Sequence, residues 1–206
     1  MLKPVHLGMI TLCGGFLLIA LACSSTNPLA NYEQLTPTTV MDQPEARPNN
    51  YPPEVVDRGK YLVSLLGCGT CHTDGALIGA ANREHLLAGS NVGIAFSNPL
   101  EVKYPGVVYP SNLTPDPETG LGNWSDEQII NMVRTGTNNH GGSTISVMPW
   151  PAFAIISDDD ATAIAAYLKS LPPIKHRVPS NVRPGQKASA PFVHFGIYRS
   201  KAEIDE

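Results

Sequence analysis

The stretch Gly67-Cys68-Gly69-Thr70-Cys71-His72 has the spacing Cys-x-x-Cys-His, which is the attachment signature of a c-type haem. Two thiols three positions apart can add to the two vinyl groups on one edge of a porphyrin, and the next residue, His72, is then placed to bind the iron. A thioredoxin-like redox dithiol and half of a zinc site also use a Cys-x-x-Cys pair. However, the flanks show no βαβ context, and the chain has no second Cys-x-x-Cys and no paired histidine motif. Haem attachment is therefore the favoured interpretation.

Composition narrows the class of protein. The chain has 206 residues and a formal charge of −4, which argues against nucleic acid as a partner. Charged residues make up only 16%, while there are 19 Pro and 18 Gly, as expected for a loop-rich domain wrapped around a large apolar group. Of the four cysteines, Cys68 and Cys71 belong to the motif and Cys13 and Cys23 lie near the N-terminus. No pair is left for a structural disulfide.

The N-terminus has the form of a secretory signal. Lys3 precedes the apolar run Leu7 to Leu21, which at about 15 residues falls short of the about 20 that a membrane span needs. The run ends Ala20-Leu21-Ala22-Cys23, similar to a bacterial lipobox, although Leu is usual where Ala20 stands. We therefore predict a lipoprotein signal peptide over residues 1–22 and lipidation of Cys23, with ordinary cleavage and a retained signal-anchor as alternatives. This places the chain on the periplasmic side, anchored to a membrane, where covalent haem attachment takes place in bacteria.

Three further segments follow the signal. Residues 23–53 are rich in Ser, Thr, Asn, Gln and Pro, and since they bury too little apolar surface to offset their ordering entropy, we expect a flexible tether. Residues 54–179 form the expected haem domain. Residues 180–206 form a C-terminal tail, for which packing on the domain and contact with a partner both remain open.

Two helices are predicted to cross. Apolar residues at helical spacing indicate a helix from about Pro53 to Leu66 that leads directly into the haem motif. Ser157-Asp158-Asp159-Asp160 is a capping box that begins a second helix, which Pro172 ends. The missing Cβ of Gly59 would allow a close crossing, with Tyr167 beside it.

A third helix follows a long irregular segment. Ser125-Asp126-Glu127-Gln128 is a capping box for a helix that runs to about Arg134. The segment before it, residues 73–124, is rich in Gly, Pro and Asn, with a short strand expected at Val107-Val108-Tyr109. Within that segment, His85 is interpreted as a surface residue rather than a ligand.

A second axial ligand would decide whether the iron transfers electrons or binds small molecules. Met132 lies inside a predicted helix, whereas Met148 lies in a loop braced by Pro149 and Pro151. A thioether raises the reduction potential of a haem iron. Met148 is therefore the favoured ligand. His140, which would lower the potential, and an open site are the alternatives.

With these residues in hand, the chain resembles class I c-type cytochromes, and more narrowly the haem domains of bacterial cytochrome subunits of membrane-associated alcohol and sugar-acid dehydrogenases. Four matching pieces within about residues 54–179 carry the resemblance: Cys68 to His72, Asn112-Leu113-Thr114-Pro115-Asp116 through Trp124-Ser125, Met148-Pro149-Trp150, and Ala166-Tyr167-Leu168-Lys169-Ser170-Leu171-Pro172-Pro173.

The resemblance implies a mainly α, cytochrome c-like fold with three core helices around one covalently bound haem c, and long loops. It implies His72 and Met148 as axial ligands, and a loop beside the haem propionates in which Asn112 and Trp124 donate hydrogen bonds. A Pro-bounded loop held by its own turns is the alternative. The related subunits often carry two or three haem motifs, whereas this chain has one.

The predicted function is that of a single-haem electron carrier, tethered to a membrane through its lipid anchor and passing electrons between periplasmic or membrane-associated redox proteins. The sequence has no nucleophilic triad, phosphate loop or dinucleotide fingerprint, so we expect no substrate chemistry. The alternatives are a fixed electron-transfer subunit of a dehydrogenase or oxidase complex, a haem-based ligand sensor and a peroxidase.

Overall fold

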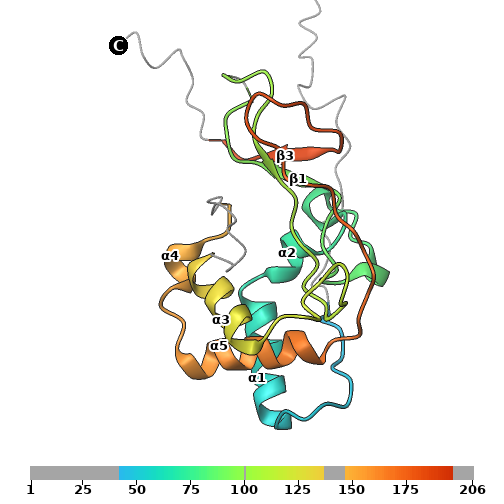
Figure 1. Ribbon diagram of the computed structural model, residues 1–206, viewed down its shortest axis with the longest axis vertical. Helices are drawn as coiled ribbons and strands as arrows, with labels where there is room; N and C mark the ends of the chain where they lie inside the picture. Colours follow the sequence, from blue (N-terminus) through green and yellow to red (C-terminus); the bar gives the residue numbers. More distant parts are fainter. Residues whose placement is uncertain (1–41, 100, 137–146, 197–206) are drawn as a thin grey trace, which may run out of the picture. The chain divides into compact units, whose positions relative to one another are not determined.

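The computed structural model describes residues 42–99, 101–136 and 147–196, all within one compact unit, residues 36–206 (Figure 1). The predicted signal peptide, Cys23 and His140 lie outside the described residues. The α-helices of the described part are α1 (Pro53–Leu65), α2 (Cys68–His72), α3 (Asp126–Thr135), α4 (Trp150–Phe153) and α5 (Asp158–Ser170). Two 3₁₀ turns, η1 (Ala76–Ile78) and η2 (Arg83–His85), and three short strands, β1 (Gly93–Ala95), β2 (Val107–Val108) and β3 (Phe192–His194), complete the list. Within these ranges, no helix combines the length and the apolarity needed to cross a bilayer.

The crossing of α1 and α5 is the largest packing contact in the described fold. At Gly59, an added Cβ would overlap with the carbonyl oxygen of Ala163 and lie 2.7 Å from Cβ of Tyr167. The predicted close crossing at Gly59, with Tyr167 beside it, is therefore confirmed. Val63 and Ile164 are among the side chains fully buried in the surrounding core.

Helix α3 packs against α5, and both begin as the sequence predicts. Ser125 and Gln128 form a complete capping box, with Ser125 Oγ accepting from the Gln128 amide and the Gln128 side chain accepting from the Ser125 amide. Ser157 Oγ likewise accepts from the amide of Asp160. Arg134, near the end of α3, joins the two helices because its guanidinium lies 2.7 Å from Asp158 and donates to the carbonyl of Ile156.

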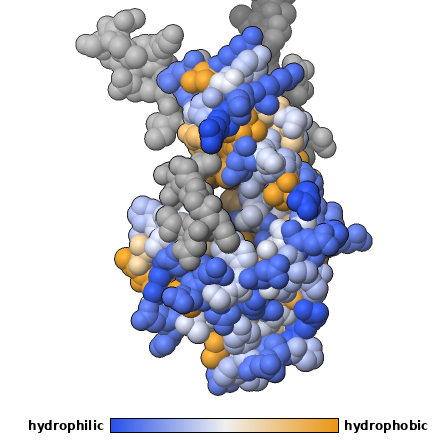
Figure 2. Space-filling model, in the orientation of Figure 1, coloured by the Kyte–Doolittle hydropathy of each residue, from blue (hydrophilic) through white to orange (hydrophobic). Residues whose placement is uncertain are grey.

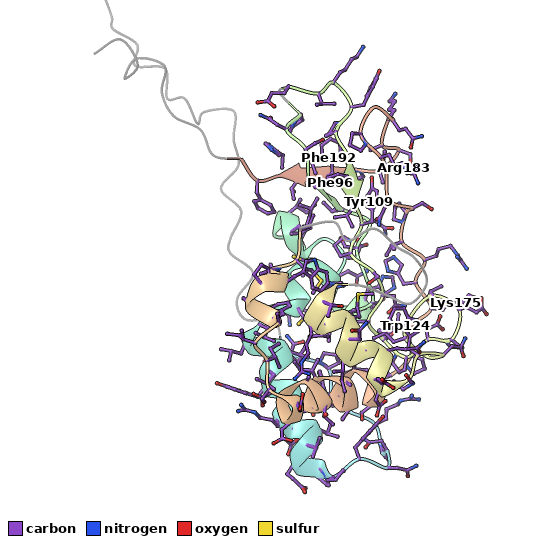
Figure 3. All side chains as sticks on the ribbon, turned by 60° about the vertical axis from the view of Figure 1, so that its left-hand side comes forward. Phe96, Tyr109, Trp124, Lys175, Arg183 and Phe192 are labelled. Atoms are coloured by element: carbon purple, nitrogen blue, oxygen red, sulfur yellow. The ribbon has the colours of Figure 1, made fainter. Side chains whose placement is uncertain are left out.

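A small sheet brings the C-terminal tail back to the domain. Its order is β2-β1-β3, with β1 antiparallel to β2 and parallel to β3. The sequence predicts a strand at Val107-Val108-Tyr109, and β2 confirms it for Val107–Val108. For the tail, strand β3 shows that residues 192–194 pair with β1. Phe96, Tyr109 and Phe192 gather around this sheet (Figure 3), and hydrophobic surface shows in the same upper part of the molecule in Figure 2.

The end of the predicted tether is bound to the domain rather than free. The backbone amide of Arg47 donates to the carbonyl of Ser170 at 2.8 Å, and the hydroxyl of Tyr167 donates to the carbonyl of Pro44. Tyr51 packs against the core and donates to the carboxylate of Asp126. A flexible tether is therefore wrong for residues 42–52, because backbone carbonyls and one aromatic ring anchor a segment whose composition is polar. Residues 23–41 lie outside the described part.

The substitution Gly59→Ala tests the helix crossing. Because the new methyl group would meet the backbone of α5, which cannot rotate away, we expect a loss of about 1–3 kcal/mol in the free energy of unfolding, measured by urea denaturation. The exposed residue Ser64 in the same helix is the control, and Ser64→Ala should leave stability nearly unchanged. Equal stability of the two variants would contradict a tight crossing.

Candidate functional site

The Cys-x-x-Cys-His motif forms the single short helix α2, directly after α1. Gly67 makes the turn between the two helices in the left-handed conformation, with φ of 68°, which glycine adopts without steric cost. Cys68 and Cys71 are three residues apart on this helix and therefore lie on the same face. His72 is its last residue. The motif is thus presented by one rigid turn, as attachment at two neighbouring points on a porphyrin edge requires.

His72 is held in the form that binds a metal. Its side chain is buried, with 8% of the residue exposed, and its Nδ1 lies 2.7 Å from the carbonyl oxygen of Ser111. Since a carbonyl only accepts, Nδ1 carries the hydrogen and Nε2 keeps its lone pair. Burial also lowers the pKa of His72, which favours the neutral imidazole at pH 7. A metal-binding histidine typically donates its other ring N–H to a carbonyl in this way.

The two thiols do not have the properties of a redox dithiol. Burial raises the pKa of the Cys68 thiol to about 11 and also raises the pKa of Cys71, whereas reactive dithiols have a lowered pKa. Among the described residues, no group of His, Cys, Asp or Glu ligands that could hold a metal includes either cysteine. The thioredoxin-like and zinc interpretations of the motif therefore lack support, and the residues present fit a covalently attached haem.

The chain beyond the motif is fixed by hydrogen bonds to the next segment. The backbone amide of Gly89 donates to the carbonyl of His72 at 2.8 Å. Thr73, fully buried, accepts from the amide of Leu87 through Oγ1. His72 is therefore held from two sides, by its own ring and by the backbone that follows it.

The side chain of Asn112 is hydrogen-bonded within its own loop and to the chain after α5, so its amide is not left to donate to another group. Its Nδ2 donates to Oγ1 of Thr119 at 2.9 Å and to the carbonyl of Ile174 at 2.7 Å. Its Oδ1 accepts from the amide and the hydroxyl of Thr114. Both amide hydrogens of this buried side chain are used within the protein, which favours the alternative of a loop held by its own turns over hydrogen bonds to a haem propionate.

The other predicted site residues lie on separate elements. Trp124 ends the same loop just before α3 and packs against the core. Nζ of Lys169 donates to its backbone carbonyl at 2.7 Å. Met148 is partly buried and lies directly before α4, where its carbonyl accepts from the amide of Trp150. The indole nitrogen of Trp150 is buried, and within the described residues it has no hydrogen-bond partner.

Ser111 is the functional residue that the sequence analysis missed. It acts through its backbone carbonyl, and a carbonyl has no sequence signal. The only available hint was its position, directly before the Asn112 loop.

A buried neutral histidine at the end of a Cys-x-x-Cys turn defines a protein that binds a c-type haem. The sequence model named Cytochrome c matches residues 56–172, and the chain belongs to the cytochrome c family. Membership implies covalently bound haem c, and it implies a role in electron transfer rather than in the chemical conversion of a substrate.

Several relatives are cytochrome subunits of dehydrogenases. The cytochrome c subunit of a quinone-type alcohol dehydrogenase from Gluconobacter oxydans is 36% identical over 114 residues, 55% of this chain and 20% of that protein. The fructose dehydrogenase cytochrome subunit from Gluconobacter japonicus is 29% identical over 177 residues, 83% of this chain and 32% of that protein. The gluconate 2-dehydrogenase cytochrome c subunit from Pantoea cypripedii is 32% identical over 113 residues, 55% of this chain and 22% of that protein. The chain thus matches a third or less of the length of each of these three relatives.

The substitution Asn112→Ala tests the role of the hydrogen bonds of this side chain. It would leave buried partners of the amide unpaired, so we expect a loss of about 1–3 kcal/mol in the free energy of unfolding, measured by thermal or urea denaturation. Asn123, which is exposed in the same loop and donates to the carbonyl of Pro117, is the control, and Asn123→Ala should cost much less. A variant of Asn112 that keeps its stability but shifts the reduction potential would instead support contact with a propionate.

Proposed function

We propose that this protein is a single-haem c-type cytochrome that carries electrons between periplasmic or membrane-associated redox proteins. The observation that supports the proposal most strongly is the state of His72: buried, neutral, and oriented by the carbonyl of Ser111. A ligand that is fixed before and after the iron changes oxidation state favours electron transfer, because little has to move.

Each residue of the motif has a defined task in this proposal. The thiols of Cys68 and Cys71 would add across the two vinyl groups, so that each S–H bond and each vinyl π bond would be replaced by a C–S and a C–H bond with no net oxidation. Nε2 of His72 would bind the haem iron. When bound, the haem supplies a one-electron couple at its iron. The helices α1, α3 and α5 would form the three-helix shell around this one group.

Met148 is the proposed second axial ligand. Pro149 follows it, and the short helix α4 begins at Trp150, so the backbone next to the thioether is restrained on one side. The buried indole nitrogen of Trp150, two residues after Met148, has no hydrogen-bond partner in the described residues, so a donor next to Met148 in the chain is available to a further group.

The remaining proposal concerns location. A lipid on Cys23 would hold the haem domain at the outer face of a membrane, and residues 24–41 would set its reach. The support is the lipobox-like sequence Ala20-Leu21-Ala22-Cys23. Acyl chains on that cysteine would give stable attachment, since more than one chain is needed for it.

A fixed subunit of a dehydrogenase complex is the second candidate, because the relatives named above are subunits of such enzymes. Those proteins are three or more times longer than the part that matches this chain. The regions by which they assemble with other subunits can therefore lie outside the matching part, and a free carrier remains the main proposal.

Replacement of Met148 tests the axial ligand. Met148→Leu keeps the volume of the side chain but removes the sulfur, so the visible spectrum of the reduced protein should change and the ferrous form should bind carbon monoxide at neutral pH. Met132→Leu, the same change inside α3, is the matched control and should alter neither. If the spectrum of Met148→Leu equals that of the parent, Met148 is not the ligand; if the parent itself binds carbon monoxide, the ligand-sensor hypothesis is favoured.

Replacement of Cys23 tests the anchor. Cys23→Ser should move the haem protein from the membrane fraction to the soluble periplasmic fraction, whereas Cys13→Ser should leave it with the membrane. Membrane retention of Cys23→Ser would contradict the lipid anchor.

Size-exclusion chromatography after mild detergent extraction of the parent should show one chain with one haem. Stable co-purification of a larger subunit would instead favour the fixed-subunit candidate.

A further inference from the structure

A second group of potential ligands lies outside the haem motif. Asp74, His85 and His176 are each partly buried, and one ligand atom from each lies within 4.8 Å of the other two. The three residues come from separate segments: the turn after α2, the 3₁₀ turn η2, and the chain that follows α5. The rings of His85 and His176 lie against each other, with centroids 4.6 Å apart.

His176 is oriented like a metal ligand. Its Nδ1 lies 2.9 Å from the carbonyl oxygen of Ala88. Because that carbonyl can only accept, Nδ1 carries the hydrogen and Nε2 presents its lone pair toward the cluster. This is the same arrangement that the Ser111 carbonyl imposes on His72, and it fixes both the tautomer and the ring orientation.

The side-chain amide of Asn91 lies between two of these ligands and donates to both. Its Nδ2 lies 3.1 Å from Oδ2 of Asp74 and 3.2 Å from Nε2 of His176. The backbone amide of Asn91 separately donates to Oδ1 of Asp74 at 2.7 Å. A cation could therefore replace the amide group of Asn91 while the backbone hydrogen bond continues to orient the carboxylate.

His85 provides an independent sign of a missing partner. Its Nδ1 is buried, and within the described part of the chain no hydrogen-bond partner reaches it. A buried ring nitrogen without a partner costs free energy and requires an explanation. The expectation that His85 is simply a surface residue is therefore wrong, since the ring is half-buried and packed on His176.

We propose that Asp74, His85 and His176 bind a divalent transition-metal ion of the zinc class. Two imidazoles and one carboxylate are a common ligand set for zinc, with a water in the fourth position. Magnesium and calcium prefer oxygen ligands and would gain little from two imidazoles. Metal–ligand bonds of about 2.0–2.2 Å require the ligand atoms to approach to roughly 3.4 Å in a tetrahedron, which side-chain rotations and withdrawal of the Asn91 amide can supply.

The bound ion would act as a clamp between segments that are distant in the sequence. Asp74 follows the haem-binding turn, and His176 lies in the segment whose residue Ile174 is bonded to Asn112. Coordination would therefore join the start of the long irregular segment to the chain after α5. Because only the folded chain brings the three ligands together, the ion should stabilise the folded state.

Zinc titration of the full-length, haem-loaded protein after removal of metals with a chelator tests the site. We expect isothermal titration calorimetry with zinc chloride to show one saturable equivalent, and the thermal midpoint to rise with zinc and fall again with EDTA. His85→Phe keeps a planar ring and removes both nitrogens, and Asp74→Asn keeps the size of the side chain and removes the charge. Each should weaken binding at least tenfold.

His194→Phe, the same change in β3, is the matched control and should bind zinc like the parent. The visible haem spectrum and circular dichroism establish that each variant is folded. The proposal is overturned if the parent does not bind zinc, if His194→Phe loses as much affinity as His85→Phe, or if calcium stabilises the parent as strongly as zinc does. None of these readouts depends on electron transfer, so this proposal and the proposed function can fail separately.

Discussion

The backbone contact between α1 and α5 at Gly59 determines where the functional groups lie. Because no side chain separates the two helices at this point, their axes approach closely and the rest of each helix is fixed with respect to the other. The end of α1 then leads through Gly67 into the haem-binding turn. The end of α5 leads through Leu171 into the segment that contains Ile174 and His176. One crossing thus positions both chain segments on which the site is built.

Local sequence signals predicted the elements that depend on neighbouring residues. Each of these signals is decided within a few positions: the capping box at Ser125, the N-cap at Ser157 and the apolar spacing of α1. The structure has the helices where these signals place them, with the full, reciprocal capping box at Ser125. Gly59 was also identified, because a glycine inside a helix needs a reason. Elements of this kind can be read from one sequence, since the interactions that form them are between residues close together in the chain.

The features that the sequence did not predict depend on distant backbone groups. Strand β3 pairs with β1, with Phe192 opposite Gly93, and a three-residue strand has no periodicity by which to recognise it. The segment around Arg47 is bound through the carbonyls of Ser170 and Leu171, which any residue could supply. The same holds for Ser111 at the haem site. The Cys-x-x-Cys-His motif identifies the ligand, but it does not identify the carbonyl that orients the ligand.

The segment after α5 connects these long-range features. Ile174 both accepts from Nδ2 of Asn112 and donates to Oγ1 of Thr114. Two residues later, the amide of His176 donates to Oγ1 of Thr119, and its ring donates to the carbonyl of Ala88. The neighbour of Ala88, Gly89, is bonded to the backbone of His72. A displacement of this segment would therefore move the two groups bonded to His72. It would move Ser111 through the adjoining Asn112 loop, and it would move Gly89 through the neighbouring Ala88.

This arrangement gives His72 two supports, one at its ring and one at its backbone carbonyl, and both are connected to the segment after α5. The motif alone would place an imidazole at the end of a five-residue helix, which is too short to be stable by itself. The ring is held by the backbone carbonyl of Ser111, and the neighbouring Asn112 is bonded to the carbonyl of Ile174 in the chain after α5. The geometry of His72 therefore depends on more than the three helices and the haem motif, because Ile174 and His176 hold the segments that adjoin it.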